Sequence, residues 1–162
     1  MFKYPAAVYF RAGYFHQIIE ETHMEPYVRK AHFYETDQMG VIHHSNYIRW
    51  FEEARVDFMD QLGYGYERNA SLGIDFAVLS VSCEYKSMVC FGDTVEVKMR
   101  ISEFSPVRMT ISYEITDSAT GRLVSTGYTK HCYFDKTLGK PVSLKKHLPD
   151  LYDLFLRNSD AG

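Results

Sequence analysis

The stretch YETDQMGVIHHSNYIRWFEEAR at residues 34–55 decides the fold, because it leads from a turn into a long amphipathic helix. The apolar residues that recur at helical spacing from there are Tyr47, Phe51, Ala54, Phe58 and Leu62. Acidic residues occupy the opposite face, and Gly63 is a natural stop. The pattern predicts one helix over residues 46–62, capped by Ser45 or Asn46.

The rest of the chain is rich in strand patterns. Residues 27–36 predict a short strand before the helix. After a Gly-rich and Tyr-rich connection, apolar and polar residues alternate in four segments, at residues 77–85, 95–102, 108–115 and 123–134. Such alternation is typical of antiparallel strands with one packed face. We therefore expect an α+β fold in which the helix covers a four-strand meander, followed by a short helix over residues 148–156 that begins at Pro149.

The composition indicates a globular protein of one domain. The chain has 162 residues, of which 46% are hydrophobic and 24% charged. Eighteen Lys and Arg against twenty-one Asp and Glu give a net charge of −3, which argues against broad nucleic-acid or anionic-membrane binding. No apolar stretch is long enough for a transmembrane helix. We expect an N-terminal appendage at residues 1–26 that is not an export signal, the domain at residues 27–156, and a tail at residues 157–162.

The cysteines and histidines give no sign of a metal or cofactor. Cys83, Cys90 and Cys132 contain no Cys-x-x-Cys pair, so we interpret them as reduced thiols of a cytoplasmic protein. His43 and His44 are adjacent in the chain, and adjacent histidines rarely bind one ion. We therefore expect no metal, and we interpret His43 as a packed or solvent-facing ring.

One carboxylate lies close in sequence to the start of the helix. Asp37 occupies a turn, and the helix begins seven residues later, near His44. A helix start offers free N–H groups that stabilise an oxyanion, and a carboxylate can activate water or attack directly. These parts suit transfer of an acyl group to water. The alternative is that Asp37 only forms the turn, and spacing alone favours that interpretation.

A family resemblance changes this weighting. The pieces that carry it are Thr36-Asp37, Gly40-Val41-Ile42, His43-His44, Asn46-Tyr47 and Glu53-Ala54-Arg55. Together they resemble the motif of the hotdog-fold acyl-CoA thioesterases, of the 4-hydroxybenzoyl-CoA thioesterase and YbgC-like type. The resemblance extends over about residues 27–155, and it is most specific in this motif.

The resemblance implies a fold, an assembly and an active site. The family fold is an antiparallel sheet wrapped around one long central helix. Its subunits pair edge to edge as homodimers, which often assemble into homotetramers, with the active site at the subunit interface. Asp37 matches the catalytic carboxylate, acting as general base or as nucleophile. The backbone N–H of His44 matches the group that polarises the thioester carbonyl.

The residues around that pair are expected to bind the substrate. On the family motif these are Gly40, Val41, Asn46 and Tyr47. The chain departs from the motif at Gln38, Met39 and His43, which affects the choice of acyl group rather than the reaction.

Other side chains have two interpretations each. Arg108, Lys136 and Lys140 either contact the phosphates of coenzyme A or are scattered solubilising charges. Trp50, Phe51 and Phe58 could line an acyl groove, but helical spacing favours a core role for the two phenylalanines. Glu52 and Glu53 are expected on a solvated or interface face, where pairing with Arg49 or Arg55 needs no catalytic role.

The sequence thus predicts a hydrolase that cleaves an acyl-CoA thioester into a carboxylic acid and coenzyme A, without a cofactor. Two alternatives remain open. One is a thioesterase acting on acyl carrier protein, which would need a basic docking patch. The other is a non-catalytic acyl-CoA-binding protein of the same fold.

Overall fold

The computed structural model describes residues 24–65, 68 and 71–160. The strands are β1 (Tyr27–Lys30), β2 (Ile74–Tyr85), β3 (Thr94–Phe104), β4 (Arg108–Asp117), β5 (Leu123–Asp135) and β6 (Lys140–Pro141). The helices are the 3-10 turn η1 (Phe33–Glu35), α1 (Ser45–Gln61), α3 (Leu144–His147) and α4 (Pro149–Arg157). Most of the expected appendage, residues 1–23, lies outside the described residues, so the division of the chain stays a prediction.

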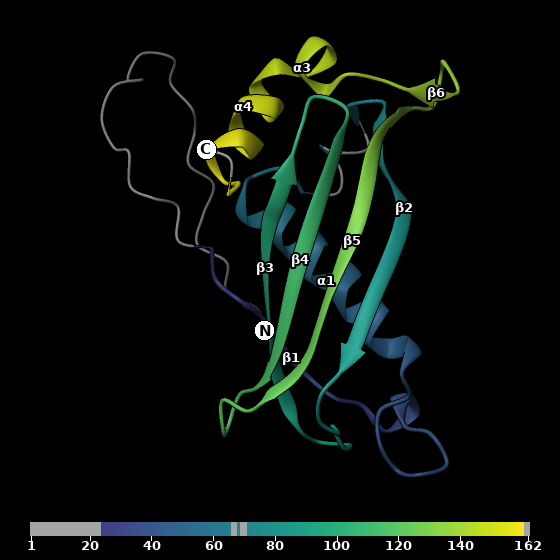
Figure 1. Ribbon diagram of the computed structural model, residues 1–162, viewed down its shortest axis with the longest axis vertical. Helices are drawn as coiled ribbons and strands as arrows, with labels where there is room; N and C mark the ends of the chain where they lie inside the picture. Colours follow the sequence, from purple (N-terminus) through teal and green to yellow (C-terminus); the bar gives the residue numbers. More distant parts are fainter. Residues whose placement is uncertain (1–23, 66–67, 69–70, 161–162) are drawn as a thin grey trace.

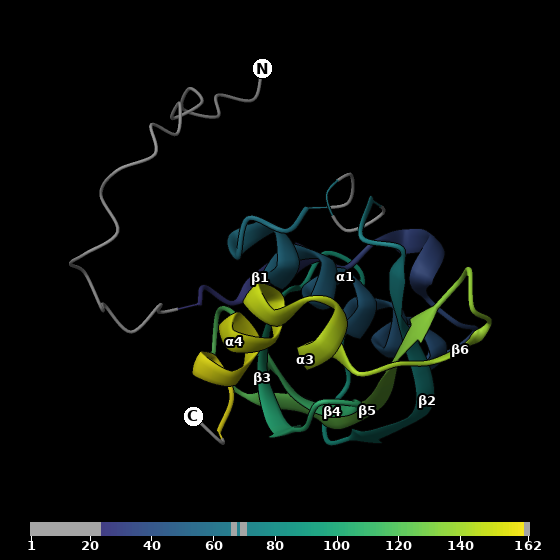
Figure 2. The same ribbon diagram turned by 90° about the horizontal axis from the view of Figure 1, so that it is seen from above.

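All strand pairs are antiparallel, and the sheet has the order β1-β3-β4-β5-β2, with β6 beside β5. The sheet curls around α1, which crosses its inner face diagonally (Figures 1 and 2). This confirms the α+β class and the sheet wrapped around one central helix. The expected meander is correct for β3, β4 and β5 but wrong for β2. That strand pairs with β5 rather than β3, because α1 carries the chain across the sheet before β2 begins.

The apolar stripe of α1 forms the core, as its spacing predicts. Trp50, Phe51, Ala54 and Phe58 are all buried. The Phe51 ring stacks on Tyr113 of β4 with 4.2 Å between ring centroids. It also packs on Gly127 of β5, where a Cβ atom would lie 2.7 Å from the ring and 2.5 Å from the carbonyl oxygen of Ser82. Only glycine fits there, because any side chain would displace the helix or the neighbouring strand.

Several boundaries differ from the sequence prediction, and two of them lie beside the predicted site. β1 ends at Lys30 instead of Thr36, because the chain turns at η1, where the side chain of Glu35 accepts a hydrogen bond from the N–H of His32 (2.8 Å). Helix α1 begins at Ser45, and neither Ser45 nor Asn46 caps it through its side chain.

The alternating pattern of β2 does not mark a packed face. The alternation predicts that Leu79, Val81 and Tyr85 face the core. The register against β5 shifts between Val78 and Ser80, within this stretch. All three are exposed. β2 is one of the two edge strands, and among the described residues no strand pairs with its outer side.

The C-terminal helices close one end of the sheet. Helix α4 begins at Pro149 as predicted and buries Leu151, Tyr152 and Phe155. The N–H of Leu144 in α3 donates to the carbonyl of Pro106, in the turn between β3 and β4 (2.8 Å). In the described part of the chain, no helix is long and apolar enough to span a membrane.

Candidate active site

The residues before α1 form a short closed loop. Thr36 and Ile42 pair in an antiparallel bridge, and the N–H of Asp37 donates to the carbonyl of Val41 (2.8 Å). Gly40 completes the turn with φ +76°, a conformation that favours glycine, and its N–H donates to the carbonyl of Asp37 (3.0 Å). We call residues 35–44 the acid loop. Its backbone is fixed by its own hydrogen bonds.

Asp37 uses one carboxylate oxygen to form the turn. Its Oδ1 accepts a hydrogen bond from the N–H of Met39 (2.8 Å). This is the Asx-turn geometry of an aspartate that shapes its own backbone. Within the described residues, Oδ2 has no hydrogen-bond partner, and the side chain is half-buried. Asp37 therefore forms the turn, and one of its carboxylate oxygens remains without a partner among the described residues.

The start of α1 lies in the same loop. His44 precedes the first helical residue, and the hydrogen bonds of the described residues give its N–H no acceptor. Its carbonyl accepts a hydrogen bond from the hydroxyl of Tyr85, the last residue of β2 (3.1 Å). The ring of His43 replaces the expected cap, because Nδ1 lies 3.3 Å from the Ser45 nitrogen as acceptor and 2.8 Å from Ser45 Oγ.

A buried ion pair holds the acid loop on the sheet. The carboxylate of Glu35 is 4% exposed and accepts bonds from Arg29 Nη2 to both oxygens (2.8 Å each) and from Trp50 Nε1 (3.0 Å). The carbonyl of Glu35 in turn accepts the N–H of His43 and the side-chain amide of Asn46 (2.8 Å each). Glu35 thus connects β1 and α1 to the backbone that presents His44.

Neither ion pair of Arg29, with Glu35 or with Glu53, was predicted from the sequence. We expected Glu53 to pair with Arg49 or Arg55, but it accepts a hydrogen bond from Arg29 of β1 (2.7 Å). Helical spacing reveals partners three or four positions apart. Arg29 and Glu53 are twenty-four positions apart, so no local pattern signals their contact.

Of the four predicted substrate-binding residues on the family motif, three lie at the acid loop or the helix start, and the fourth is buried. Gly40 and Val41 lie in the acid loop, and Asn46 lies in the first turn of α1. Tyr47 follows there, but it is buried, and burial is the main cause that raises its pKa to about 12.

The basic candidates lie elsewhere. Arg108 begins β4, and β4 begins at the end of the sheet beside α3 and α4, opposite to the start of α1 (Figure 1). One chain therefore does not bring Arg108 to Asp37. Lys136 forms an ion pair with Asp75 (3.0 Å), and Lys140 belongs to β6.

Exposed apolar side chains lie on the segments around the acid loop. They are Phe33, Tyr34, Met39, Met88 and Phe91. Phe33 and Phe91 meet edge to face with 5.7 Å between ring centroids. Clustered exposed apolar groups of this kind mark surfaces that bind a ligand or another protein. Of these residues only Met39 was singled out from the sequence, as a departure from the family motif, because the others belong to no periodic pattern.

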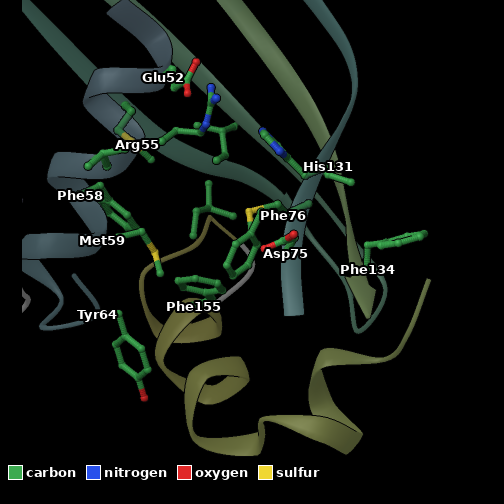
Figure 3. Close-up of a pocket in the computed structure, with 16 residues that line it drawn as sticks. Glu52, Arg55, Phe58, Met59, Tyr64, Asp75, Phe76, His131, Phe134 and Phe155 are labelled. Atoms are coloured by element: carbon green, nitrogen blue, oxygen red, sulfur yellow. The ribbon is translucent and has the colours of Figure 1, made fainter. Parts of the chain in front are cut away.

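A cavity of about 460 Å³ lies between α1, the inner face of the sheet and α4 (Figure 3). Arg55 and Phe58 of α1, Phe76 of β2, His131 of β5 and Phe155 of α4 are among its walls. Phe58 is therefore both a core residue, as predicted, and part of a cavity wall.

A buried chain of hydrogen bonds runs along the cavity. Arg55 Nη1 donates to the hydroxyl of Tyr113 (3.0 Å), which lies 2.8 Å from Thr129 Oγ1. The same Thr129 oxygen lies 2.7 Å from Nε2 of His131. No group of three His, Cys, Asp or Glu side chains suited to a metal ion occurs among the described residues.

His131 predicts a pH dependence of stability. Burial, followed by the positive charge of Arg55, lowers its pKa from 6.5 to about 4. Between these values the unfolded chain binds a proton that the folded protein does not. The contribution of His131 to the free energy of unfolding is therefore fully present above pH 6.5. It is lost as the pH drops toward 4, by up to about 3 kcal/mol.

Urea denaturation of the wild type and of His131→Gln at pH 7.0 and 4.5 measures how much stability His131 contributes at each pH. The variant lacks the titrating ring, so it should lose less stability between the two pH values than the wild type. Equal losses in the two proteins would contradict the assignment to His131.

Known proteins share this chain's sequence and fold. Residues 31–151 match the model of the thioesterase-like superfamily. The chain is 38% identical over 122 residues to an Aquifex aeolicus protein named "Putative esterase", covering 75% of this chain and 92% of that protein. It is 29% identical over 126 residues to the Bacillus subtilis "Putative acyl-CoA thioesterase YneP", covering 78% and 91%.

Solved structures are also similar to this chain. The DHNA-CoA thioesterase of Staphylococcus aureus superposes with a TM-score of 0.76 at 33% identity, covering 81% of this chain and 87% of that one. The curled sheet around α1 is thus the hotdog fold, as the sequence motif predicts. The chain belongs to the thioesterase-like superfamily and is a thioester hydrolase.

Proposed function

We propose that the protein hydrolyses an acyl-CoA thioester to the free carboxylic acid and coenzyme A. Asp37 activates water or attacks the thioester carbon, and the N–H of His44 binds the carbonyl oxygen as negative charge develops on it. One observation carries this proposal. A single closed loop presents both an unpartnered carboxylate oxygen and the free N–H at the start of α1.

The geometry supports a loop that is ordered before the substrate binds. The acid loop is closed by backbone bonds, and the buried Glu35–Arg29 pair fixes it to the sheet. Groups that are already in place need no rearrangement as charge develops in the transition state. The name of the B. subtilis relative supports coenzyme A as the carrier.

The proposal includes a homodimer, or a homotetramer built from it, in which a second copy pairs along β2. Within the part of the chain that the structure describes, this twelve-residue strand pairs only with β5, so its outer edge carries backbone groups free to pair. Val78, Leu79 and Val81 are exposed along it. Such pairing brings the active sites to the subunit interface, because Tyr85 at the end of β2 contacts His44.

The proposal also assigns the protein to the cytoplasm. Cys83, Cys90 and Cys132 are all free thiols. Free cysteines are typical of reducing compartments, where disulfides rarely persist.

A thiol-release screen tests the proposed reaction. The protein is assayed with short, long, branched and aromatic acyl-CoAs, and with one of these acyl groups attached to acyl carrier protein. We expect thiol release from at least one acyl-CoA, unchanged by a chelator, and slower release from the protein carrier. Faster release from acyl carrier protein would favour the carrier-protein enzyme. Tight acyl-CoA binding without thiol release would favour a non-catalytic binding protein.

A further inference from the structure

Arg55 is a cation without a carboxylate partner. Its side chain is half-buried at the cavity of Figure 3, and its hydrogen bond goes to the neutral hydroxyl of Tyr113. No carboxylate of the described residues lies within ion-pair distance of it. Of the two acidic residues in the cavity wall, Asp75 pairs with Lys136, and Glu52 is exposed. Several N–H donors of the guanidinium group therefore remain free.

His131 faces Arg55 from the opposite wall with an unpartnered ring nitrogen. The residue is 1% exposed, and its buried Nδ1 has no hydrogen-bond partner of full geometry; the backbone of Phe76 lies near the ring and acts weakly to raise its pKa. Figure 3 shows the imidazole directed toward the guanidinium of Arg55. A buried polar group without a partner costs free energy, so a ligand that satisfies it gains that amount.

The direction of the hydrogen-bond chain defines what Nδ1 offers. Arginine can only donate, so the Tyr113 oxygen accepts from Arg55. The Tyr113 hydrogen then goes to Thr129 Oγ1, and the Thr129 hydrogen goes to Nε2 of His131. In this direction the hydroxyl hydrogens of Tyr113 and Thr129 both have an acceptor. A neutral ring that accepts at Nε2 carries its proton on Nδ1, so Nδ1–H is a donor.

We propose that Arg55 and His131 together bind an acceptor oxygen at the far end of the acyl group. The preferred substrates are thus thioesters whose acyl chain ends in a carboxylate or a hydroxyl group. The inference rests on the proposed function, because it names the class of acyl group that the active site receives. Apolar walls formed by Phe58, Met59, Phe76 and Phe155 enclose the carbon chain. The volume of about 460 Å³ lies within the usual range of small-molecule sites.

The acid that acts on such a substrate belongs to the second copy. Arg55 lies eleven positions beyond His44, about 16 Å along α1, which is longer than a six-carbon acyl chain. Antiparallel pairing of β2 with its copy places the end of one strand beside the start of the other. The start of β2, with Asp75 and Phe76, lines the cavity, and its end contacts His44 through Tyr85. The cavity of one subunit thus faces the acid loop of its partner.

Three thioesters of equal chain length test the receptor. They are adipyl-CoA, 6-hydroxyhexanoyl-CoA and hexanoyl-CoA, assayed with the wild type, Arg55→Met and the control Arg49→Met. Arg49 is an exposed arginine of the same helix, outside the cavity wall. We expect the wild type to show kcat/KM at least about tenfold higher on an oxygen-ended substrate than on hexanoyl-CoA. Arg55→Met should bring that ratio close to one, and Arg49→Met should keep it.

A binding measurement separates the receptor from the reaction. Two thioethers that cannot be hydrolysed, S-(5-carboxypentyl)-coenzyme A and S-hexyl-coenzyme A, are titrated into the full-length wild type, and the ring nitrogen resonances of His131 are followed after assignment with His131→Gln. The two ligands differ only at the far end of the six-carbon chain, so we expect a saturable shift with the carboxyl-ended thioether that the hexyl thioether does not reproduce. This readout needs no turnover and no folded Arg55 variant, so it decides the inference even if no thioester is hydrolysed.

The outcomes are distinct. Hydrolysis of all three thioesters at equal kcat/KM, or equal shifts with both thioethers, overturns the receptor but leaves the proposed function intact. No thiol release from any acyl-CoA of the wider screen, together with a shift specific to the carboxyl-ended thioether, overturns the proposed function and supports the receptor as a carboxylate site.

Discussion

Replacing Asp37 by asparagine is expected to lower kcat for thioester hydrolysis by about 10²–10⁴-fold or more, with little change in stability. The amide can neither accept a proton from water nor attack the thioester carbon. Its carbonyl oxygen can still accept the Met39 N–H, so the Asx turn and the acid loop should persist. Thiol release measures the rate, and the melting temperature monitors the fold.

Asp93→Asn is the matched control for this substitution. Asp93 is also a turn aspartate, since its Oδ2 accepts the N–H of Cys90 (2.8 Å), but it lies outside the acid loop. The control should retain nearly full turnover. Near-normal turnover in Asp37→Asn, or an equal loss in both variants, would refute the role assigned to Asp37.

Arg29→Met is expected to cause the largest loss of stability among simple substitutions, about 3–5 kcal/mol in the free energy of unfolding. The side chains of Arg29 and Glu35 are 8% and 4% exposed, and the substitution leaves the carboxylate of Glu35 buried without its counter-charge. Methionine preserves much of the side-chain volume, so the missing charge dominates the effect. Urea denaturation at pH 7 measures it.

Glu53→Gln is the control for the ion pair. It removes the other carboxylate that contacts Arg29, but the Glu53 side chain is 42% exposed, so its loss should cost less than about 1 kcal/mol. Equal, small losses in both variants would mean that the buried pair does not hold the acid loop. Because Glu35 carries the backbone of His43, a folded Arg29 variant should also show reduced kcat, which marks Glu35 as a positioning residue.

The local parts of the fold are predictable from the sequence. Helix α1, the strands β3 to β5 and the start of α4 at Pro149 follow from periodicity and from the position of a proline. The position of β2 in the sheet does not, because periodicity states that a segment is a strand but not which strand lies beside it. The helix start also differs from the expectation, because the ring of His43 occupies the place of a capping side chain.

The candidate site divides in the same way. Asp37 and His44 are seven residues apart, so one motif contains both. The polar contacts that support them join distant segments. Arg29 is only six residues from Glu35, but it also contacts Glu53 on α1. Arg55 is connected to His131 through Tyr113 and Thr129, which lie on two different strands. Contacts of this kind depend on how the sheet curls, which no local pattern encodes.

The position of β5 inside the sheet has a consequence for how such enzymes diversify. This strand is hydrogen-bonded to β4 on one side and to β2 on the other, so its backbone is held independently of its inward side chains. If Arg55 and His131 bind the acyl end as proposed, substitutions at His131, and at Thr129 to which its ring is hydrogen-bonded, are expected to change the acyl preference while the strand pairing is kept. A small library at these two positions would be an economical source of thioesterases with new selectivities.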